Sequence, residues 1–230
     1  MLSIKNLEFE ILRQKIVMDF SLNLNYGEVI TLFGASGCGK TTILRLISSL
    51  ETPKNGSIVN KFRKTAYLFQ ENRLLNNLTA LKNVLICMEK PDEKTVLEHF
   101  ALIGLSHKDA QKYPYELSGG MAKRVAFMRA FLSSADLLLL DEPFVGLDMD
   151  LRKILANLLA RKLEAKEVAC VLVTHERNEA IMLSNTVLFL APKLMKIQKE
   201  ISLNLALKDR DDAFITKCLN DDFKGVIYYD

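Results

Sequence analysis

Residues 29–42 read VITLFGASGCGKTT, and this stretch decides the fold. Residues 29–33 have the apolar character of a short buried strand, and residues 41–50 carry apolar side chains at helical spacing. Between them the chain fits the pattern GxxxxGK[ST], whose glycines let backbone N–H groups crowd around phosphate oxygens. A glycine turn can end in Lys-Thr by chance, but the strand–loop–helix context favours a nucleotide phosphate site. Its expected residues are Gly34, Ala35, Ser36, Gly37, Cys38, Gly39, Lys40, Thr41 and Thr42.

Lys40 and Thr41 are the two side chains expected to act on the nucleotide. Lys40 would bring a mobile ammonium group to the β- and γ-phosphates, and the Thr41 hydroxyl would ligate Mg²⁺. The helix that starts at this point directs its positive end at the same phosphates. The loop therefore predicts binding of ATP, or a similar nucleotide, together with Mg²⁺.

Outward from this loop the pattern alternates between strands and helices. Residues 2–9 and 16–24 alternate apolar with polar, as antiparallel edge strands do. Further strands are predicted at 64–69, 137–140, 168–174 and 187–190, with helices at 148–165 and 178–183. This order indicates an α/β fold, with a P-loop NTPase core built on a mainly parallel sheet and an N-terminal antiparallel β subdomain.

Residues 71–134 are mostly helical in pattern, with breaks at Pro91, Gly104 and Pro114, and predict an inserted helical subdomain. A further break is expected over 52–56. We therefore expect one domain over 1–230. Its nucleotide-binding core would cover about 1–70 and 135–190, and 191–230 would be a C-terminal tail of mixed pattern.

The amino-acid composition limits the classes of protein to which the chain can belong. The chain has 230 residues, of which 49% are hydrophobic and 26% charged, with a formal net charge of +3. That is too hydrophobic for a disordered chain, and too balanced in charge to favour nucleic acid as a partner. The four cysteines are widely spaced, which favours reduced thiols over disulfides or a zinc site. No apolar run approaches the ~20 residues that span a bilayer, so we expect a soluble protein.

A second acidic element follows the apolar run at 137–140. Asp141 and Glu142 come directly after this predicted strand, at the end where ligands bind in open α/β sheets. Asp141 would hold Mg²⁺ through water, and Glu142 would orient and polarise the attacking water. An acidic strand end is common by itself, but the phosphate loop upstream strengthens the interpretation.

The third element is Leu117-Ser118-Gly119-Gly120-Met121, just ahead of a helix with apolar periodicity. A Ser cap followed by two glycines exposes several N–H groups and suits an anion, although it also fits an ordinary capped helix. Because it lies between the phosphate loop and Asp141-Glu142, the segment resembles the LSGGQ signature of ATP-binding cassette (ABC) ATPases. Met121 departs from that pattern at its last position.

Other residues match this family in order, over roughly 2–190. Gln70 resembles the Q-loop glutamine, a ligand of Mg²⁺ and water that senses the membrane partner. Residues 146–148 resemble the D-loop, and His175 resembles the switch histidine at the γ-phosphate. Singly, each has an unremarkable reading as a solvated, helix-capping or strand-end residue. The resemblance implies catalytic roles for Glu142, His175, Lys40 and Gln70, and a metal site of Thr41, Gln70 and Asp141.

The base pocket departs from the family pattern. Members usually stack the adenine on an aromatic residue in the first strand pair, where this chain has Ile11, with Phe9 nearby. Stacking on Phe9 and apolar contact with Ile11 are the two alternatives. In the signature, Ser118, Gly119 and Gly120 carry the charge recognition, so Met121 is expected to alter the interface more than to abolish it.

The resemblance further implies a head-to-tail homodimer or heterodimer of cassettes, with each ATP between one phosphate loop and the other protomer's residues 118–120. ATP binding closes the dimer, hydrolysis opens it, and the cycle moves a permease that is a separate polypeptide. The expected location is cytoplasmic, on the inner face of the membrane. Residues 70–84 look most like those of nitrate/sulfonate/taurine-type importers, and this implies import of a small anion or vitamin precursor with a periplasmic or surface binding protein.

Several alternatives remain open. One is the ATPase of an exporter or of a lipoprotein-release complex. Repair-type ABC ATPases carry a long coiled coil between phosphate loop and signature, whereas here only 43–116 intervene, and translation types carry two cassettes in one chain. A nucleotide-binding regulator is disfavoured because Glu142 and His175 are both present. Finally, Leu74, Leu75 and Leu78 fit either the core of the helical subdomain or a groove for a permease helix.

Overall fold

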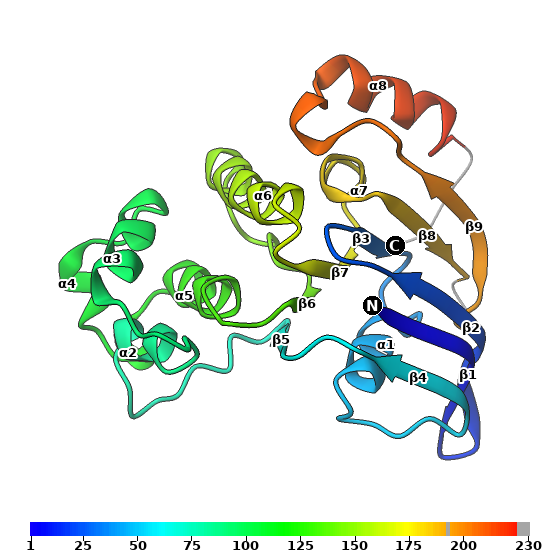
Figure 1. The fold of residues 1–230 in the computed structure, drawn as a ribbon, viewed down its shortest axis with the longest axis horizontal. Helices are drawn as coiled ribbons and strands as arrows, with labels where there is room; N and C mark the ends of the chain where they lie inside the picture. Colours follow the sequence, from blue (N-terminus) through cyan, green and yellow to red (C-terminus); the bar gives the residue numbers. More distant parts are fainter. Residues whose placement is uncertain (192–193, 225–230) are drawn as a thin grey trace.

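The structure is a computed structural model that describes residues 1–191 and 194–224. Figure 1 shows two sheets. An antiparallel sheet has the order β2-β1-β4, formed by β1 (Leu2–Ile11), β2 (Gln14–Leu24) and β4 (Asn55–Asn60). A larger sheet has the order β5-β6-β7-β3-β8-β9, formed by β3 (Val29–Phe33), β5 (Thr65–Leu68), β6 (Leu137–Asp141), β7 (Ala169–Thr174), β8 (Thr186–Leu190) and β9 (Ile197–Ser202).

Strands β5, β6, β7, β3 and β8 pair in parallel, and β9 pairs antiparallel with β8. This confirms the predicted α/β fold with a mainly parallel sheet. Every residue of β3, β6 and β7 is buried, so these central strands are covered on both faces. Alternate side chains of β6 accordingly belong to different cores: Leu138 and Leu140 lie in one, and Leu137 and Leu139 in the other.

Layers of helix and sheet cover the larger sheet. The antiparallel sheet and α1 (Lys40–Ile47) share the core of one face, whereas α5 (Gly119–Phe131) and α6 (Met149–Glu164) share the core of the opposite face. At the β8 end, α7 (Arg177–Leu183) and α8 (Asp212–Asp221) enclose a third cluster. Its centre is three edge-to-face aromatic rings, those of Phe33, Phe189 and Phe223.

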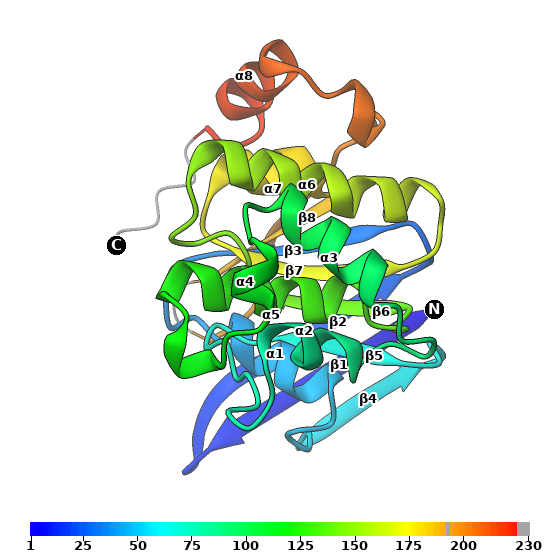
Figure 2. The same ribbon diagram turned by 90° about the vertical axis from the view of Figure 1, so that its left-hand side faces the viewer.

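The predicted helical region lies at one end of the molecule, in green in Figures 1 and 2. It comprises α2 (Ala80–Leu85), α3 (Glu93–Leu102), α4 (His107–Ala110), the 3₁₀ helix η1 (Pro114–Glu116) and α5. Helix α5 lies between the smaller helices and the sheet, and contacts both α2 and β5. The inserted helical subdomain of the predicted fold is thus confirmed.

Strand β4 begins within the segment 52–56, which the sequence predicts to be a break, and continues beyond it. Only Ile58 of this strand packs against the core, and its other residues are exposed, so backbone pairing with β1 contributes much of its hold. Gly56 has a φ of +86°, and a Cβ there would lie 2.4 Å from the carbonyl oxygen of Asn6. Only glycine allows the two strands to approach so closely.

The predicted tail also forms regular structure, namely β9, the 3₁₀ helix η2 (Leu207–Asp209) and α8. Arg210 anchors this segment: its guanidinium is buried and donates to the carbonyls of Ile181, Ser184, Leu203 and Leu205. The end of the tail, 225–230, lies outside the described residues. In the described ranges, no helix combines the length and apolarity that crossing a membrane requires.

Candidate active site

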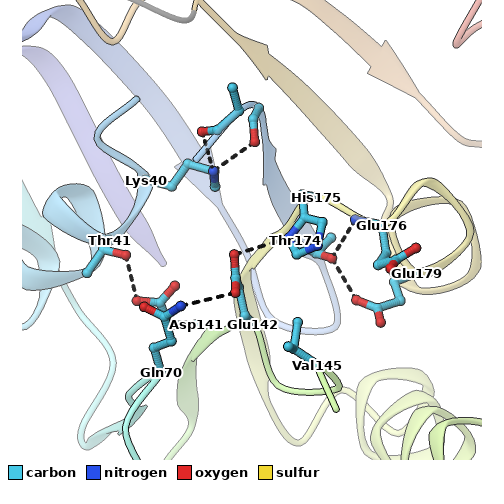
Figure 3. Close-up of polar contacts among 12 residues, drawn as sticks. Lys40, Thr41, Gln70, Asp141, Glu142, Val145, Thr174, His175, Glu176 and Glu179 are labelled. Carbon is cyan, nitrogen blue, oxygen red and sulfur yellow. Dashed lines mark hydrogen bonds and ion pairs between the residues drawn. The ribbon is translucent and has the colours of Figure 1, made fainter. Parts of the chain in front are cut away.

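Four neighbouring strands of the larger sheet deliver the predicted site residues to one edge. Because β5, β6, β7 and β3 are parallel, their carboxyl ends meet there. Gln70 follows β5, Glu142 follows β6, His175 follows β7, and the loop 34–39 follows β3. Figure 3 shows these side chains facing a common space.

The loop 34–39 ends on Gly39, which caps α1 with a φ of +105° and makes no side-chain cap bond. A Cβ at Gly39 would lie 3.3 Å from Met195 and 3.4 Å from Ile16, so both the dihedral angle and the space favour glycine. Since no cap side chain covers the first turn of α1, its N–H groups face outward as an anion site requires. The fold of this loop fits a phosphate group.

Lys40 differs from the mobile ammonium that the sequence predicts. Its residue surface is only 5% exposed, and Nζ donates to the carbonyl oxygens of Gly34 at 2.8 Å and Ala35 at 2.7 Å. The loop curls around the ammonium because these two carbonyls point inward. Both acceptors are neutral, so the positive charge is held in place without being compensated by them.

Thr41 and Asp141 lie in direct contact at the predicted metal site. The Thr41 hydroxyl donates to Asp141 Oδ2 at 2.8 Å, and the Asp141 residue is only 2% exposed. Burial raises the pKa of the Asp141 carboxyl above its usual value, and the bond from Thr41 opposes that shift. A buried carboxylate beside a hydroxyl is an oxygen donor set that suits Mg²⁺, which takes its remaining ligands from water and nucleotide phosphates. These residues therefore fit the ion.

Glu142 joins two other predicted catalytic residues. Its Oε1 lies 3.1 Å from His175 Nδ1, and its Oε2 accepts a hydrogen bond from Gln70 Nε2 at 3.3 Å. The Glu142 side chain is 14% exposed and that of His175 46%, so the pair lies at the edge of solvent. Glu142 has a φ of +49°, an unusual value for a non-glycine residue, and its N–H donates to the carbonyl of Val173. A carboxylate fixed at a strand end can polarise a water molecule.

The segment that follows Gln70 is tied to the helical subdomain. The guanidinium of Arg73 lies 4.0 Å from the ring centroid of Phe69, which precedes Gln70. Arg129, on α5, donates to the carbonyls of Asn72 and Arg73 at 3.1 and 2.8 Å. A movement of α5 relative to the sheet would therefore displace the segment that follows Gln70.

Ser118, Gly119 and Gly120 lie at the exposed start of α5. The Ser118 hydroxyl caps the helix by accepting the N–H of Met121 at 3.3 Å, and the space around both glycines is open. In the ranges that the structure describes, no hydrogen bond or ion pair joins these three residues to the phosphate loop or to Glu142. The structure thus pairs Thr41 with Asp141, and joins Gln70 and His175 to Glu142 rather than placing Gln70 on Asp141. Residues 118–120 lie apart from both groups.

The two side chains named for the base differ in exposure. Phe9 is 7% exposed and packs in the core between the sheets, so its ring offers no face for stacking. Ile11, at the end of β1, is 49% exposed. Of the two side chains, Ile11 is therefore the one that is accessible to a ligand.

Sequence reasoning missed four residues around the site. Thr174 donates to Glu179 Oε2 at 2.6 Å, Arg152 lies 3.5 Å from Glu179 Oε1, and Lys123 donates to the carbonyl of Val145. Glu179 gives one signal, as an acidic residue about one helical turn after His175. The contacts of Arg152 and Lys123 depend on tertiary packing and have no sequence signal.

Comparison with known proteins agrees with this geometry. Residues 17–145, more than half of the chain, match the family model described as ABC transporter. The chain is 37% identical over 204 residues to the aliphatic sulfonates import ATP-binding protein SsuB 1 of Pseudomonas savastanoi pv. phaseolicola, covering 88% of this chain and 86% of that protein. It is 38% identical over 203 residues to the SsuB protein of Bacillus subtilis, covering 84% and 80% of the two chains.

Among solved structures, a dimeric ATP-binding cassette in a post-hydrolysis state, bound to ADP and Pi, matches with a TM-score of 0.78 and 26% identity. The match covers 89% of this chain and 100% of that chain. The similarity spans the phosphate loop, the helical subdomain and the acidic strand end alike. The chain therefore belongs to the ABC transporter family, as an ATP-binding cassette that binds and hydrolyses ATP.

Proposed function

We propose that this cassette powers a separate membrane permease that imports a small organic sulfonate or a related anion. The observation that carries the proposal is the near-full-length similarity to proteins named for aliphatic sulfonate import, at 37–38% identity. Another relative, 37% identical over 192 residues, is named for sulfate/thiosulfate import, so anionic sulfur compounds recur among the relatives. The permease, a substrate-binding protein and a place on the cytoplasmic face of the membrane belong to the same proposal.

The same proposal assigns a part to each segment of the chain. The nucleotide-binding core would comprise about 1–70 and 135–190, the helical subdomain 71–134, and the tail 191–230. In the core, Lys40 and the loop 34–42 would bind the phosphates, while Thr41, Gln70 and Asp141 would hold Mg²⁺, which supplies charge neutralisation at the phosphates when bound. Glu142 would polarise the attacking water, and His175 would contact the γ-phosphate.

The remaining contacts come from the base pocket and from a second cassette. Ile11 would contact the base through its exposed aliphatic side chain. Ser118, Gly119 and Gly120 would bind the γ-phosphate of ATP held by the partner cassette, because they lie at the exposed start of a helix with open space around both glycines. A homodimer or heterodimer would therefore have two complete sites, and a monomer none.

Uptake by cells tests the import proposal. Cells deleted for this chain should lose ATP-dependent uptake of radiolabelled ethanesulfonate, and the wild-type chain should restore it. Cells that carry the Lys40→Ala chain are the control for ATP hydrolysis. Unchanged ethanesulfonate uptake in the deleted cells would contradict import of this anion class, and a gain in cellular retention of the label would indicate export instead.

Leu75 is the residue best placed to contact the permease. It is 44% exposed, whereas Leu74 packs against the main core. Asn83 is fully buried and bonds to both the N–H and the carbonyl of Leu75, which orders the loop that presents this side chain. An exposed leucine on an ordered loop suits an apolar contact with a permease helix.

Leu75→Glu should therefore lower uptake by about tenfold, since one charged group at an apolar contact costs at least ~1.4 kcal/mol. Hydrolysis of ATP by the isolated cassette should be unchanged. Leu102→Glu, on α3 and 55% exposed, is the matched control and should leave uptake at the wild-type rate. Normal uptake with Leu75→Glu would remove Leu75 from the coupling surface.

A further inference from the structure

Two hydrogen bonds of Thr174 flank His175. Thr174 ends β7 and is fully buried, and its hydroxyl donates to Glu179 Oε2 at 2.6 Å. The same hydroxyl oxygen accepts the N–H of Glu176 at 3.0 Å. One bond therefore fixes the residue before His175 and the other the residue after it, as Figure 3 shows. The orientation of the histidine toward Glu142 depends on this turn.

Glu179 is an unusual group to find in this position. It lies on α7, its side chain is 9% exposed, and Oε1 has no hydrogen-bond donor. The nearest cation is Arg152, whose Nη1 lies 3.5 Å from that oxygen. A buried carboxylate that has a single hydroxyl donor and a single ion pair with a partly exposed cation is costly, so stability alone does not account for it.

Arg152 connects Glu179 to a second loop. It lies on α6, and its Nε donates to the carbonyl of Leu147 at 2.8 Å. Lys123, on α5, donates to the carbonyl of Val145 at 2.7 Å in the same loop. The loop 145–148 is thus held on one side by α5, the helix that begins at Ser118, and on the other by the cation facing Glu179.

We propose that Glu179 is a positioning residue for ATP hydrolysis, which holds the His175 turn through Thr174 and links that turn to the loop 145–148 through Arg152. The inference rests on the proposed role of His175 at the γ-phosphate. Glu179 touches neither nucleotide nor water and acts through its two partners. A shift of α5 or α6 is transmitted to the histidine by this route, because each link is a direct contact between side chain and backbone or between two side chains.

Thr174→Val and Thr174→Ser are the variants that isolate the link. Valine keeps the β-branched shape in a buried strand but removes the hydroxyl, whereas serine keeps the hydroxyl. Phosphate release at saturating ATP and Mg²⁺ should fall about tenfold with Thr174→Val, as expected when directly coupled groups are separated. Thr174→Ser should restore most of the rate, and the KM for ATP should stay within about twofold in both, because neither side chain binds the nucleotide.

Glu179→Gln and Arg152→Met test the other two members. Each should lower kcat, and the double variant should be no slower than the slower single one, since residues that act as a unit are not additive. Arg161→Met, at an exposed position of the same helix, is the matched control and should hydrolyse ATP at the wild-type rate. Thermal unfolding of every variant separates loss of fold from loss of rate.

His175→Ala distinguishes the inference from the proposed function. In that background, Thr174→Val should cause no further loss, because its effect passes through His175. A slow His175→Ala together with a fast Thr174→Val would overturn the inference alone, as would a tenfold loss from Thr174→Val that persists without His175. A His175→Ala protein at the wild-type rate would overturn both the inference and the role proposed for His175. If Glu179→Gln fails to fold, the Thr174 pair still decides the matter.

Discussion

Replacing Lys40 with alanine is expected to lower ATP hydrolysis by about 10²–10³-fold, the loss seen when one preorganised charge-stabilising group is deleted. The Lys40 residue is 5% exposed and its ammonium group is fixed by two backbone carbonyls, so the charge is already positioned within the loop that would bind the phosphates. Phosphate release at saturating ATP measures the effect. If the loss persists when ATP is raised to millimolar concentration, weakened ATP binding is not its whole cause.

The fold should survive this change. The variant loses two hydrogen bonds to carbonyls at the edge of the sheet, which costs about 1–3 kcal/mol of unfolding free energy. Lys108→Ala, at an exposed position of α4, is the matched control and should hydrolyse ATP normally. Parental hydrolysis by a folded Lys40→Ala protein would show that the loop 34–42 does not bind the reacting phosphates.

Buried strands were predictable because they are continuous apolar runs. The bounds predicted for β3 agree with the structure, and β6 extends one residue beyond its prediction, to Asp141. Strands β4 and β9 were not predictable in the same way, since both lie at sheet edges and have few apolar residues packed against a core: Ile58 in β4, and Ile197 and Ile201 in β9. Helix α1 ends at Ile47 rather than at residue 50, and Ser49 just beyond it has a φ of +58°.

The site was predictable where its residues follow strands in a fixed order. Gln70, Glu142 and His175 lie far apart in the chain, but the parallel sheet brings their backbones to one edge, and their side chains meet there. The inward turn of Lys40, the burial of Phe9 and the Thr174–Glu179–Arg152 contacts were not predictable. These features depend on which side chains the packed helices place opposite the loops. A local sequence pattern carries no information about that tertiary packing.

Glu142→Gln should abolish nearly all hydrolysis while leaving ATP bound. The amide keeps the shape of the carboxylate and can still meet Gln70 and His175, but it lacks the charge that polarises water, a loss of about 10²–10⁴-fold. With hydrolysis blocked, the ATP-bound state should persist. Equilibrium binding of ATP at parental affinity, together with phosphate release near background, is the expected pair of results.

Ser118 is expected to act in this persistent ATP-bound state. In a single chain its hydroxyl caps α5 and contacts no residue of the phosphate loop in the described ranges, so the proposed site is complete only when a second cassette contributes residues 118–120. Such contacts to the γ-phosphate would exist with ATP and would be lost with ADP. Ser118→Arg should block the junction without preventing ATP binding to the monomer. Ser106→Arg, at the cap of α4, is the matched control for a bulky charge at an exposed helix start.

Size-exclusion chromatography of the Glu142→Gln protein tests the central claim most directly. We expect a dimer with ATP, a monomer with ADP, and a monomer with ATP once Ser118→Arg is added, whereas Ser106→Arg should leave the dimer intact. The run should be repeated without Mg²⁺, which prevents residual hydrolysis, and at high protein concentration, which favours association. A Glu142→Gln protein that stays monomeric with saturating ATP under all of these conditions, or that dimerises equally well with ADP, would contradict the shared site.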